Sequence, residues 1–218
     1  MILQTLKILS NELENFLDSF VEDGVDSKRV VIGNIAFHES EKYRPNSVDV
    51  TTDDKIVLTV VRVQEESILK NNAHYTKNSP LTTVDYHNPK VHVNLYILIT
   101  CNSFLYENAM TYLSRVIRFF QSKNVFTELN TDPILSGINE MDRFENFRLL
   151  MDLYSPSFEE ANHLWSMMGG KQLPFVMYKL RALDLEFRTI SSTGQRVEEI
   201  HVVDEASGET VIVTKEEP

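Results

Sequence analysis

The sequence has few residues for covalent or phosphate chemistry, with one cysteine, Cys101, and seven glycines in 218 residues. A single cysteine excludes an internal disulfide and a four-thiolate zinc site, and it fits synthesis in a reducing cytosol. The glycines form no phosphate-binding loop, and neither Gly-Lys-Ser nor Gly-Lys-Thr occurs. Disulfide-stabilised scaffolds and P-loop nucleotidases are therefore excluded as classes.

Long hydrophobic runs are also missing. No apolar stretch approaches the roughly 20 residues that a helix needs to cross a bilayer. The apolar start, residues 1–10, runs directly into Glu12, Glu14 and Asp18, with no basic leader and no small-residue cleavage site. We therefore expect neither a signal peptide nor a membrane span.

Positive charge is scarce, and the deficit lies at the two ends. The whole chain carries a net charge of −11. Residues 1–26 hold one lysine against six carboxylates, a net of −5, and residues 196–218 hold two cations against seven carboxylates, again −5. Such a surface repels phosphates, which excludes nucleic acid as a partner. The acidic ends are either solvated or meet basic neighbours in an assembly.

No set of catalytic side chains stands out. The best metal candidate is Glu159 with His163, four residues apart on a predicted helix, but no third ligand is visible. Cys101 with His92 is a weak candidate for a nucleophile, because Cys101 falls on the apolar face of a predicted strand and is expected in the core. We predict no catalytic residue, no metal and no cofactor.

The N-terminal half is predicted as a helix followed by strands. The helix carries apolar residues at spacings of three and four, which form one stripe: Ile2, Leu6, Leu9, Leu13, Phe16 and Phe20. Gly24 ends it. Strands follow at Val30–Phe37 and at Lys55–Val63, and the second is apolar enough to be central. Residues 70–90, rich in asparagine and proline, are predicted as a long loop of unassigned role.

The rest of the body alternates strands and helices. Val91–Cys101 alternates apolar and more polar residues and is predicted as a strand with one apolar face. Ser157 and Glu160 have the spacing of a capping box, which opens a helix that ends at Gly169-Gly170. The remaining predicted elements are a helix at Leu105–Gln121 and strands at Val125–Leu129, Phe144–Tyr154 and Phe175–Phe187.

The C-terminal residues are predicted to form a separate arm. A polar linker at 189–196 leads to two short strands, 199–204 and 209–214, around a turn at 205–208. An isolated hairpin is marginally stable in water, so it packs either on its own domain or on a neighbouring subunit. The residues for such a subunit exchange are Ile200, Val202, Val211 and Val213. The predicted domains are thus 1–188 and the arm 189–218.

The predicted fold class is α/β (α+β), with a mixed central β-sheet flanked by the N-terminal helix and two further helices. Three segments in this order resemble the cap, or tail-terminator, family of phage-tail-like contractile injection systems of the Photorhabdus virulence cassette and antifeeding prophage type. They are the N-terminal helix followed by Ile-Gly-Asn-Ile-Ala-Phe, the strand and helix of Val93–Thr127, and Leu150–Arg181 with its Asn-His-Leu-Trp and Pro-X-X-X-Tyr-Lys-X-Arg marks. The resemblance covers about 30–185 well and leaves the C-terminal hairpin unmatched.

This resemblance implies a structural protein with a tail-terminator fold and no enzymatic role. It implies a homohexameric ring at the distal end of the tube and sheath, with the inner tube protein and the sheath protein as partners. The chain would be made in the bacterial cytoplasm and end in a particle that can be released. The basic residues proposed to contact tube or sheath are Arg115, Arg118, Lys171, Lys179 and Arg181.

Three alternatives stay open. The first is an adaptor elsewhere in the same particle, at the baseplate or at the tube–sheath junction. The second is a metal-dependent hydrolase that uses Glu159 and His163, and the third is a free-standing small-molecule-binding domain. A monomer with ligand-dependent melting would favour the third.

Overall fold

A computed structural model describes residues 1–20, 28–37, 52–66, 75–78, 83–87, 91–131, 139, 147–185, 190–195, 200–203 and 210–213. Contacts divide the chain into two compact units. Unit 1 comprises residues 1–67 and 92–185, and unit 2 comprises residues 68–91 and 186–218. No helix in the described part of the chain is both long and apolar enough to span a membrane.

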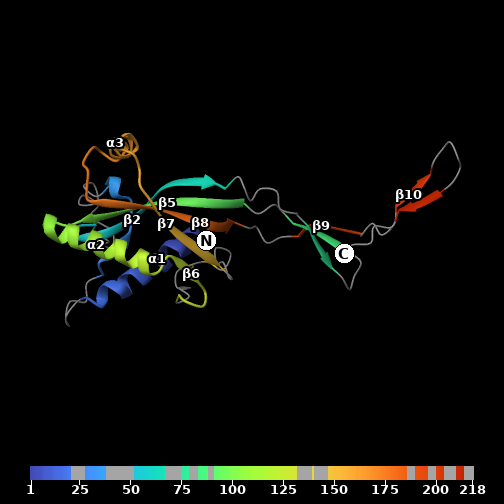
Figure 1. The fold of residues 1–218 in the computed structure, drawn as a ribbon, viewed down its shortest axis with the longest axis horizontal. Helices are drawn as coiled ribbons and strands as arrows, with labels where there is room; N and C mark the ends of the chain where they lie inside the picture. Colours follow the sequence, from blue (N-terminus) through green and yellow to red (C-terminus); the bar gives the residue numbers. More distant parts are fainter. Residues whose placement is uncertain are drawn as a thin grey trace. The chain divides into compact units, whose positions relative to one another are not determined.

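Unit 1 is built on a six-stranded mixed sheet in the order β1-β2-β5-β8-β7-β6 (Figure 1). Strands β1 and β2 are parallel, whereas β2 and β5, β7 and β8, and β6 and β7 are antiparallel. The strands are β1 (Val30–Ile32), β2 (Lys55–Glu65), β5 (Val91–Asn102), β6 (Val125–Thr127), β7 (Arg148–Tyr154) and β8 (Phe175–Leu185). The predicted mixed α/β fold is confirmed, and β2 is an interior strand as expected.

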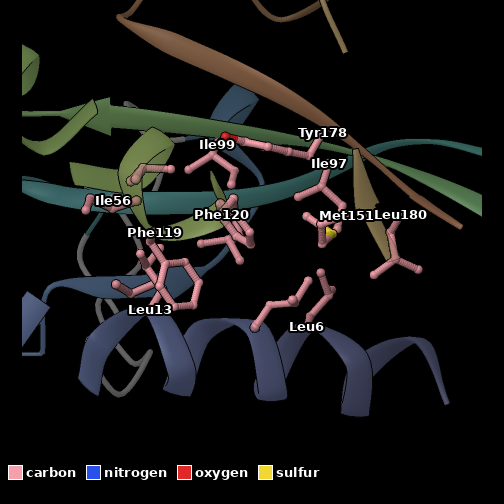
Figure 2. Close-up of a cluster of buried hydrophobic side chains, with 14 of the residues drawn as sticks. Leu6, Leu13, Ile56, Ile97, Ile99, Phe119, Phe120, Met151, Tyr178 and Leu180 are labelled. Carbon is pink, nitrogen blue, oxygen red and sulfur yellow. The ribbon is translucent and has the colours of Figure 1, made fainter. Parts of the chain in front are cut away.

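Three helices cover the two faces of this sheet: α1 (Ile2–Asp18), α2 (Tyr106–Ser122) and α3 (Phe158–Met167). Residues of α1 and α2 share the larger hydrophobic core with one face, and α3 packs on the other (Figure 1). Figure 2 shows Leu6 and Leu13 of α1 beneath Ile97 and Ile99 of β5. Burying a leucine side chain of this kind contributes about 1.5–3 kcal/mol, so the apolar stripe of α1 fixes the helix on the sheet.

Three N-terminal carboxylates form hydrogen bonds or ion pairs within unit 1. Glu14 accepts hydrogen bonds from the backbone N–H groups of Arg29 and Val30, at 2.7 to 3.1 Å, which holds the start of β1 against α1. Glu12 forms a 2.6 Å ion pair with Lys123 after α2, and Asp18 forms a 3.0 Å pair with Arg29. Half of the six carboxylates in residues 1–26 therefore stabilise the fold.

Several predicted elements were wrong in extent. The strand expected at Val30–Phe37 ends at Ile32 and is followed by a 3-10 helix, η1 (Ile35–Phe37). The Thr59 hydroxyl donates to the Gly33 carbonyl at 2.7 Å and accepts from the Ile35 N–H at 3.3 Å. The Thr59 side chain thus takes the place of the backbone hydrogen bonds that would continue strand β1, and the chain bends away and enters η1. The N-terminal helix also ends earlier than predicted, at Asp18, and Gly24 lies outside the described residues.

Strand β5 was predicted to have one apolar face, but both of its faces are buried. Ile97 and Ile99 lie in the core shared with α1 and α2, whereas Leu98 belongs to a second cluster with Leu164 of α3. The helix α3 covers the second face, which periodicity along β5 alone does not reveal.

Unit 2 contains two small sheets. One has the order β3-β4-β9, from β3 (Tyr75–Asn78), β4 (Thr83–His87) and β9 (Ile190–Gln195), and the other is the hairpin of β10 (Ile200–Val203) and β11 (Thr210–Val213). The predicted long loop 70–90 therefore contains β3 and β4, and the predicted linker 189–196 contains β9. These strands were missed because they are polar, and because β4 pairs with β9 from more than 100 residues along the chain.

The C-terminal hairpin is confirmed as a local structure. Strands β10 and β11 pair antiparallel, with Ile200 opposite Val213 and Val202 opposite Val211. No third strand joins this sheet among the residues that the structure describes.

Candidate interaction surfaces

The five basic residues predicted to contact partners lie on different parts of unit 1. Arg115 is half-buried on α2, with its guanidinium carbon 4.9 Å from the centre of the Phe20 ring, and Arg118 is exposed one turn further along. Lys171 is exposed after the Gly169-Gly170 turn, where both glycines have positive φ angles of 99° and 83°. The prediction grouped these residues by their charge alone, but the fold places Arg115 and Arg118 on α2, apart from the other three.

Lys179 and Arg181 lie on the α3 side of the sheet, in a row of charged and aromatic side chains that we call the cation strip. It consists of Arg62, Tyr96, Asp152, Lys179 and Arg181. Two cations lie over the Tyr96 ring, with the Arg62 guanidinium carbon at 5.7 Å and the Lys179 nitrogen at 5.9 Å from its centre. Arg181 forms an ion pair with Asp152. Each exposed cation–π contact contributes about 0.5–1 kcal/mol, which favours these positions of the Arg62 and Lys179 side chains.

Arg62 is a candidate that the sequence reasoning missed. It lies opposite Tyr96 in the register of β2 and β5, just after an irregularity between Val60 and Arg62. No pattern within residues 55–65 indicates that position, because it depends on a strand that starts at Val91. Three cations face one carboxylate in this strip, which favours an acidic partner.

A groove of about 850 Å³ lies beside α3, and we call it the α3 groove. Its walls come from α3, from the loop that precedes it, from the ends of β7 and β8, and from Ile117 of α2. None of the lining residues is charged: Ile117, Leu153, Tyr154, Ser155, Pro156, Ser157, Phe158, Ala161, Asn162, Trp165, Ser166, Gly170, Gln172, Phe175, Val176 and Met177. This volume is within the range of pockets that enclose an apolar group.

Trp165 is the buried anchor of α3, as predicted. Its side chain is 5% exposed and packs against Phe175 with ring centres 5.4 Å apart. Its indole N–H, however, has no acceptor among the described residues. A buried donor without an acceptor costs about 1–3 kcal/mol, so the packing of this indole carries a local cost.

Phe104, Leu105 and Tyr106 form a second exposed apolar feature, which we call the apolar tripeptide. These side chains are 79%, 64% and 70% exposed. Leu105 occupies the N-cap position of α2 and makes no capping hydrogen bond. Ser103, two residues before Leu105, donates its hydroxyl hydrogen to the Asp54 carboxylate at 2.5 Å. The sequence pattern predicted this segment only as the beginning of a helix.

The candidates for chemistry have surroundings that suit structural roles. Burial raises the pKa of the Cys101 thiol to about 12, so the thiol is protonated at neutral pH and its position in the core is confirmed. Glu159 and His163 are both exposed on α3. Within the described ranges, no three potential ligands gather around them or elsewhere.

The family model of the Pvc16 N-terminal domain matches residues 4–199. The chain belongs to the Pvc16 N-terminal domain family. The match runs through both units and stops at the first residue before the hairpin strand β10. No curated protein sequence matches the chain significantly.

The fold is shared with a solved structure from an injection system. The cryo-EM structure of the PVC sheath/tube terminator, from an extracellular contractile injection system in the extended state, aligns with a TM-score of 0.53 and 12% identity. The alignment covers 93% of this chain and 64% of that one. The tube-terminating cap of the anti-feeding prophage aligns with a TM-score of 0.47 and 14% identity, over 87% of this chain and 60% of that one.

This Pvc16 N-terminal domain chain therefore spans slightly less than two thirds of the length of the terminator whose fold it shares. The resemblance to tail terminators inferred from the sequence is confirmed at the level of family and fold. The tube and sheath contacts assigned to Arg115, Arg118, Lys171, Lys179 and Arg181 stay predictions, as does the subunit exchange assigned to Ile200, Val202, Val211 and Val213.

Proposed function

We propose that this chain is a structural cap that ends the tube and sheath of a contractile injection system by closing into a ring, with six copies as the expected number. The observation that carries the proposal is the family match over residues 4–199, together with a terminator fold over 93% of the chain. The role we assign is non-catalytic. Its partners would be copies of itself, the inner tube protein and the sheath protein, and it would be made in the cytoplasm before joining the distal end of the particle.

A terminator needs two unlike faces, one that fits the last ring and one that offers no site for another. Unit 1 has two unlike sides, because α1 and α2 cover one face of the sheet and α3 only part of the other. Arg118 lies on the first side, and the cation strip lies on the second. When unlike surfaces of neighbouring copies bind each other, the rotation from one copy to the next either returns to the first copy and gives a closed ring, or does not and gives a fibre. The geometry of these surfaces therefore determines whether the assembly is finite.

We further propose that segment 189–218 acts as an arm between copies. Strand β9 would anchor it through β4, and the β10–β11 hairpin would pair with a neighbouring subunit. A two-stranded hairpin needs such support for stability. The seven carboxylates of residues 196–218 would discourage pairing with other strand edges, as charge does at natural sheet edges, and they complement the cation strip.

Negative-stain imaging of particles from a strain without this protein tests the terminator role. We expect tubes and sheaths of uncontrolled length, or none that survive, with restoration by the intact gene. Particles of normal length and number would contradict the proposal and would favour an adaptor elsewhere in the particle, or another role.

Charge reversals test whether the two basic surfaces contact the particle. Arg62→Glu and Arg118→Glu change exposed cations on opposite sides of the sheet, and neither arginine forms an ion pair with a described residue. Both are expected to lower the amount of chain that copurifies with particles, whereas Glu128→Arg, at an exposed position after β6, is not. Equal recovery of all three variants would reject the contact assignment and leave the terminator role to the imaging experiment.

A further inference from the structure

Side chains close the sheet of unit 1 at both of its edge strands. At the β1 edge, Glu14 of α1 accepts a hydrogen bond from the Val30 N–H at 2.7 Å. At the β6 edge, Asn130 accepts from the Thr127 N–H at 2.8 Å and donates to the Val125 carbonyl at 2.9 Å. An uncovered strand edge is a template for pairing with another chain, so these contacts block a further strand at β1 and at β6.

The last residues of β7 have no such cover in the described part of the chain. Strand β6 pairs with β7 along Arg148–Leu150 only, and on the same side the Met151 N–H donates to the Asn124 carbonyl at 2.8 Å. Backbone groups two residues apart in a strand point to the same side. The N–H and C=O of Leu153 therefore point away from β8, to a side where no described strand pairs with residues 152–154.

This open β7 edge continues into the α3 groove. Leu153 is 57% exposed and forms part of the groove wall, which residues 154–158 continue. None of the lining residues is charged, so a strand that enters the groove must be uncharged, because a charge buried there would lose its hydration without a partner. The edge offers backbone hydrogen bonds and the groove selects side chains, which is how a sheet accepts an added strand.

Strand β11 of the C-terminal hairpin meets these requirements. Its sequence is Thr-Val-Ile-Val, in which every residue is β-branched and none is charged. Strand β10 pairs with one edge of β11, and among the described residues no third strand joins the other edge. A two-stranded sheet is marginally stable in water, so the hairpin needs a strand edge of the kind that β7 leaves open.

The charges on either side of β11 match the surroundings of the groove. Residues 204–209 and 214–218 hold five carboxylates against one lysine. Lys171 is exposed one residue after the groove wall, and Arg181 is exposed on β8, the strand that pairs with β7. Opposite charges at the rim of an interface favour one partner and one register over others. An uncharged strand with acidic flanks therefore suits this edge better than an apolar segment alone.

We propose that strand β11 of one copy adds to the open β7 edge of a second copy. Its backbone forms hydrogen bonds with Leu153, and its side chains enter the α3 groove. The proposal rests on the self-association in the proposed function, and it names the surface that receives the arm. Within one chain the hairpin and β7 belong to separate sheets. The family match stops at residue 199, before the hairpin, so the family match does not itself imply this contact.

Disulfide cross-linking tests the contact in coexpressed full-length chains. One chain carries Leu153→Cys and an affinity tag, and the untagged chain carries a cysteine at each position of Thr210–Val213 in turn. Because side chains alternate along a strand, we expect heterodimer at alternate positions, at least ten-fold more abundant than at the positions between them. The native Cys101 is buried and does not compete.

Leu129→Cys is the matched control for the receiving chain, because Leu129 is a fully exposed leucine outside the groove. Equal yields from Leu153→Cys and Leu129→Cys, or yields that do not alternate, would overturn the inference. So would a disulfide within a single chain that carries both cysteines, in place of a link between chains. Cross-linking of Leu153→Cys to the tube or sheath protein in particles, without a link between copies, would assign the edge to that protein and reject the proposal.

Hydrogen exchange detects the same contact at the backbone. The Leu153 amide is expected to exchange at least ten-fold more slowly in the unchanged chain than in the Val211→Pro variant, because proline interrupts β11. The Met151 amide, which is bonded to Asn124 in the chain itself, should exchange at the same rate in both. Equal exchange at Leu153 in the two chains contradicts strand addition.

The contact and the terminator role fail separately. A chain that cross-links as expected but leaves tube length uncontrolled keeps the contact and rejects the terminator role. A chain that controls tube length without the cross-link keeps the terminator role and rejects the contact.

Discussion

At the scale of single residues, Cys101 shows how surroundings set chemistry. Its side chain is fully buried in the core between the sheet and the helices α1 and α2. Because an apolar core disfavours the thiolate, burial raises the pKa of the thiol from 9.0 to about 12. Tyr178 on β8 behaves in the same way, with its pKa raised by burial to about 12. Both side chains are packing residues that stay neutral across the physiological range.

These raised values predict a loss of stability in alkali. Between pH 9 and pH 12 the unfolded chain releases the Cys101 proton while the folded chain keeps it, so the free energy of unfolding falls as pH rises. At pH 10 the Cys101 share is about 1.4 kcal/mol, one pKa unit above the unfolded value. Urea unfolding of the Cys101→Ala variant should therefore show a shallower decline between pH 8 and pH 10 than the unchanged chain. Parallel declines would show that the thiol does not control this range.

At the scale of elements, the two helices α2 and α3 begin in opposite ways. The Ser157 hydroxyl accepts from the Glu160 N–H at 3.2 Å, and the Glu160 carboxylate accepts from the Ser157 N–H at 2.9 Å. Leu105 gives α2 no such support. The difference indicates that α3 is optimised for stability at its start, whereas the start of α2 keeps apolar side chains in solvent.

Substitution at the two caps is expected to have opposite effects on stability. Ser157→Ala should lower the free energy of unfolding by about 1 kcal/mol, because the box loses one of its two bonds. Leu105→Asp should raise it by about 1 kcal/mol, because an aspartate side chain at this position can accept a backbone hydrogen bond that leucine cannot. Urea denaturation of the two variants and of the unchanged chain measures both changes. A destabilised Leu105→Asp variant would mean that Leu105 contributes packing that its exposure does not reveal.

At the scale of the whole molecule, the chain crosses between its two units at three points, since unit 2 collects residues 68–91 and 186–218. The three-stranded sheet of unit 2 joins β3 and β4 from the middle of the sequence to β9 from its end. The hairpin therefore follows β9, which is paired with β4, so the proposed arm would begin at a fixed strand. A truncation that tests the proposed arm should therefore begin after β9.

Removal of residues 197–218 tests the arm without disturbing β9. If the hairpin pairs with a neighbouring copy, the truncated chain should form a smaller species than the full chain, as measured by light scattering at matched concentration. Val202→Pro keeps mass and charge but removes a strand N–H, and it should reproduce the loss. An oligomer of unchanged mass in both variants would reject arm exchange.

Much of the local structure followed from the sequence. Spacings of three and four located α1 and α2, Ser157 and Glu160 located the start of α3, and β-branched residues located β2 and the hairpin. These signals are short-range, because capping, periodicity and turns depend on neighbours within a few residues. The resemblance to tail terminators was also inferred from three sequence segments and their order.

The sheet order, the burial of both faces of β5, and the polar strands β3, β4 and β9 were decided by the tertiary structure. So were the cation strip, which aligns Arg62 with Tyr96 across a register, and the α3 groove with the unpaired N–H of Trp165. Each depends on segments that are distant in the chain and meet only when their shared apolar surface is buried. A single sequence determines which faces must be covered, but the packing of the whole fold determines what covers them and what stays exposed.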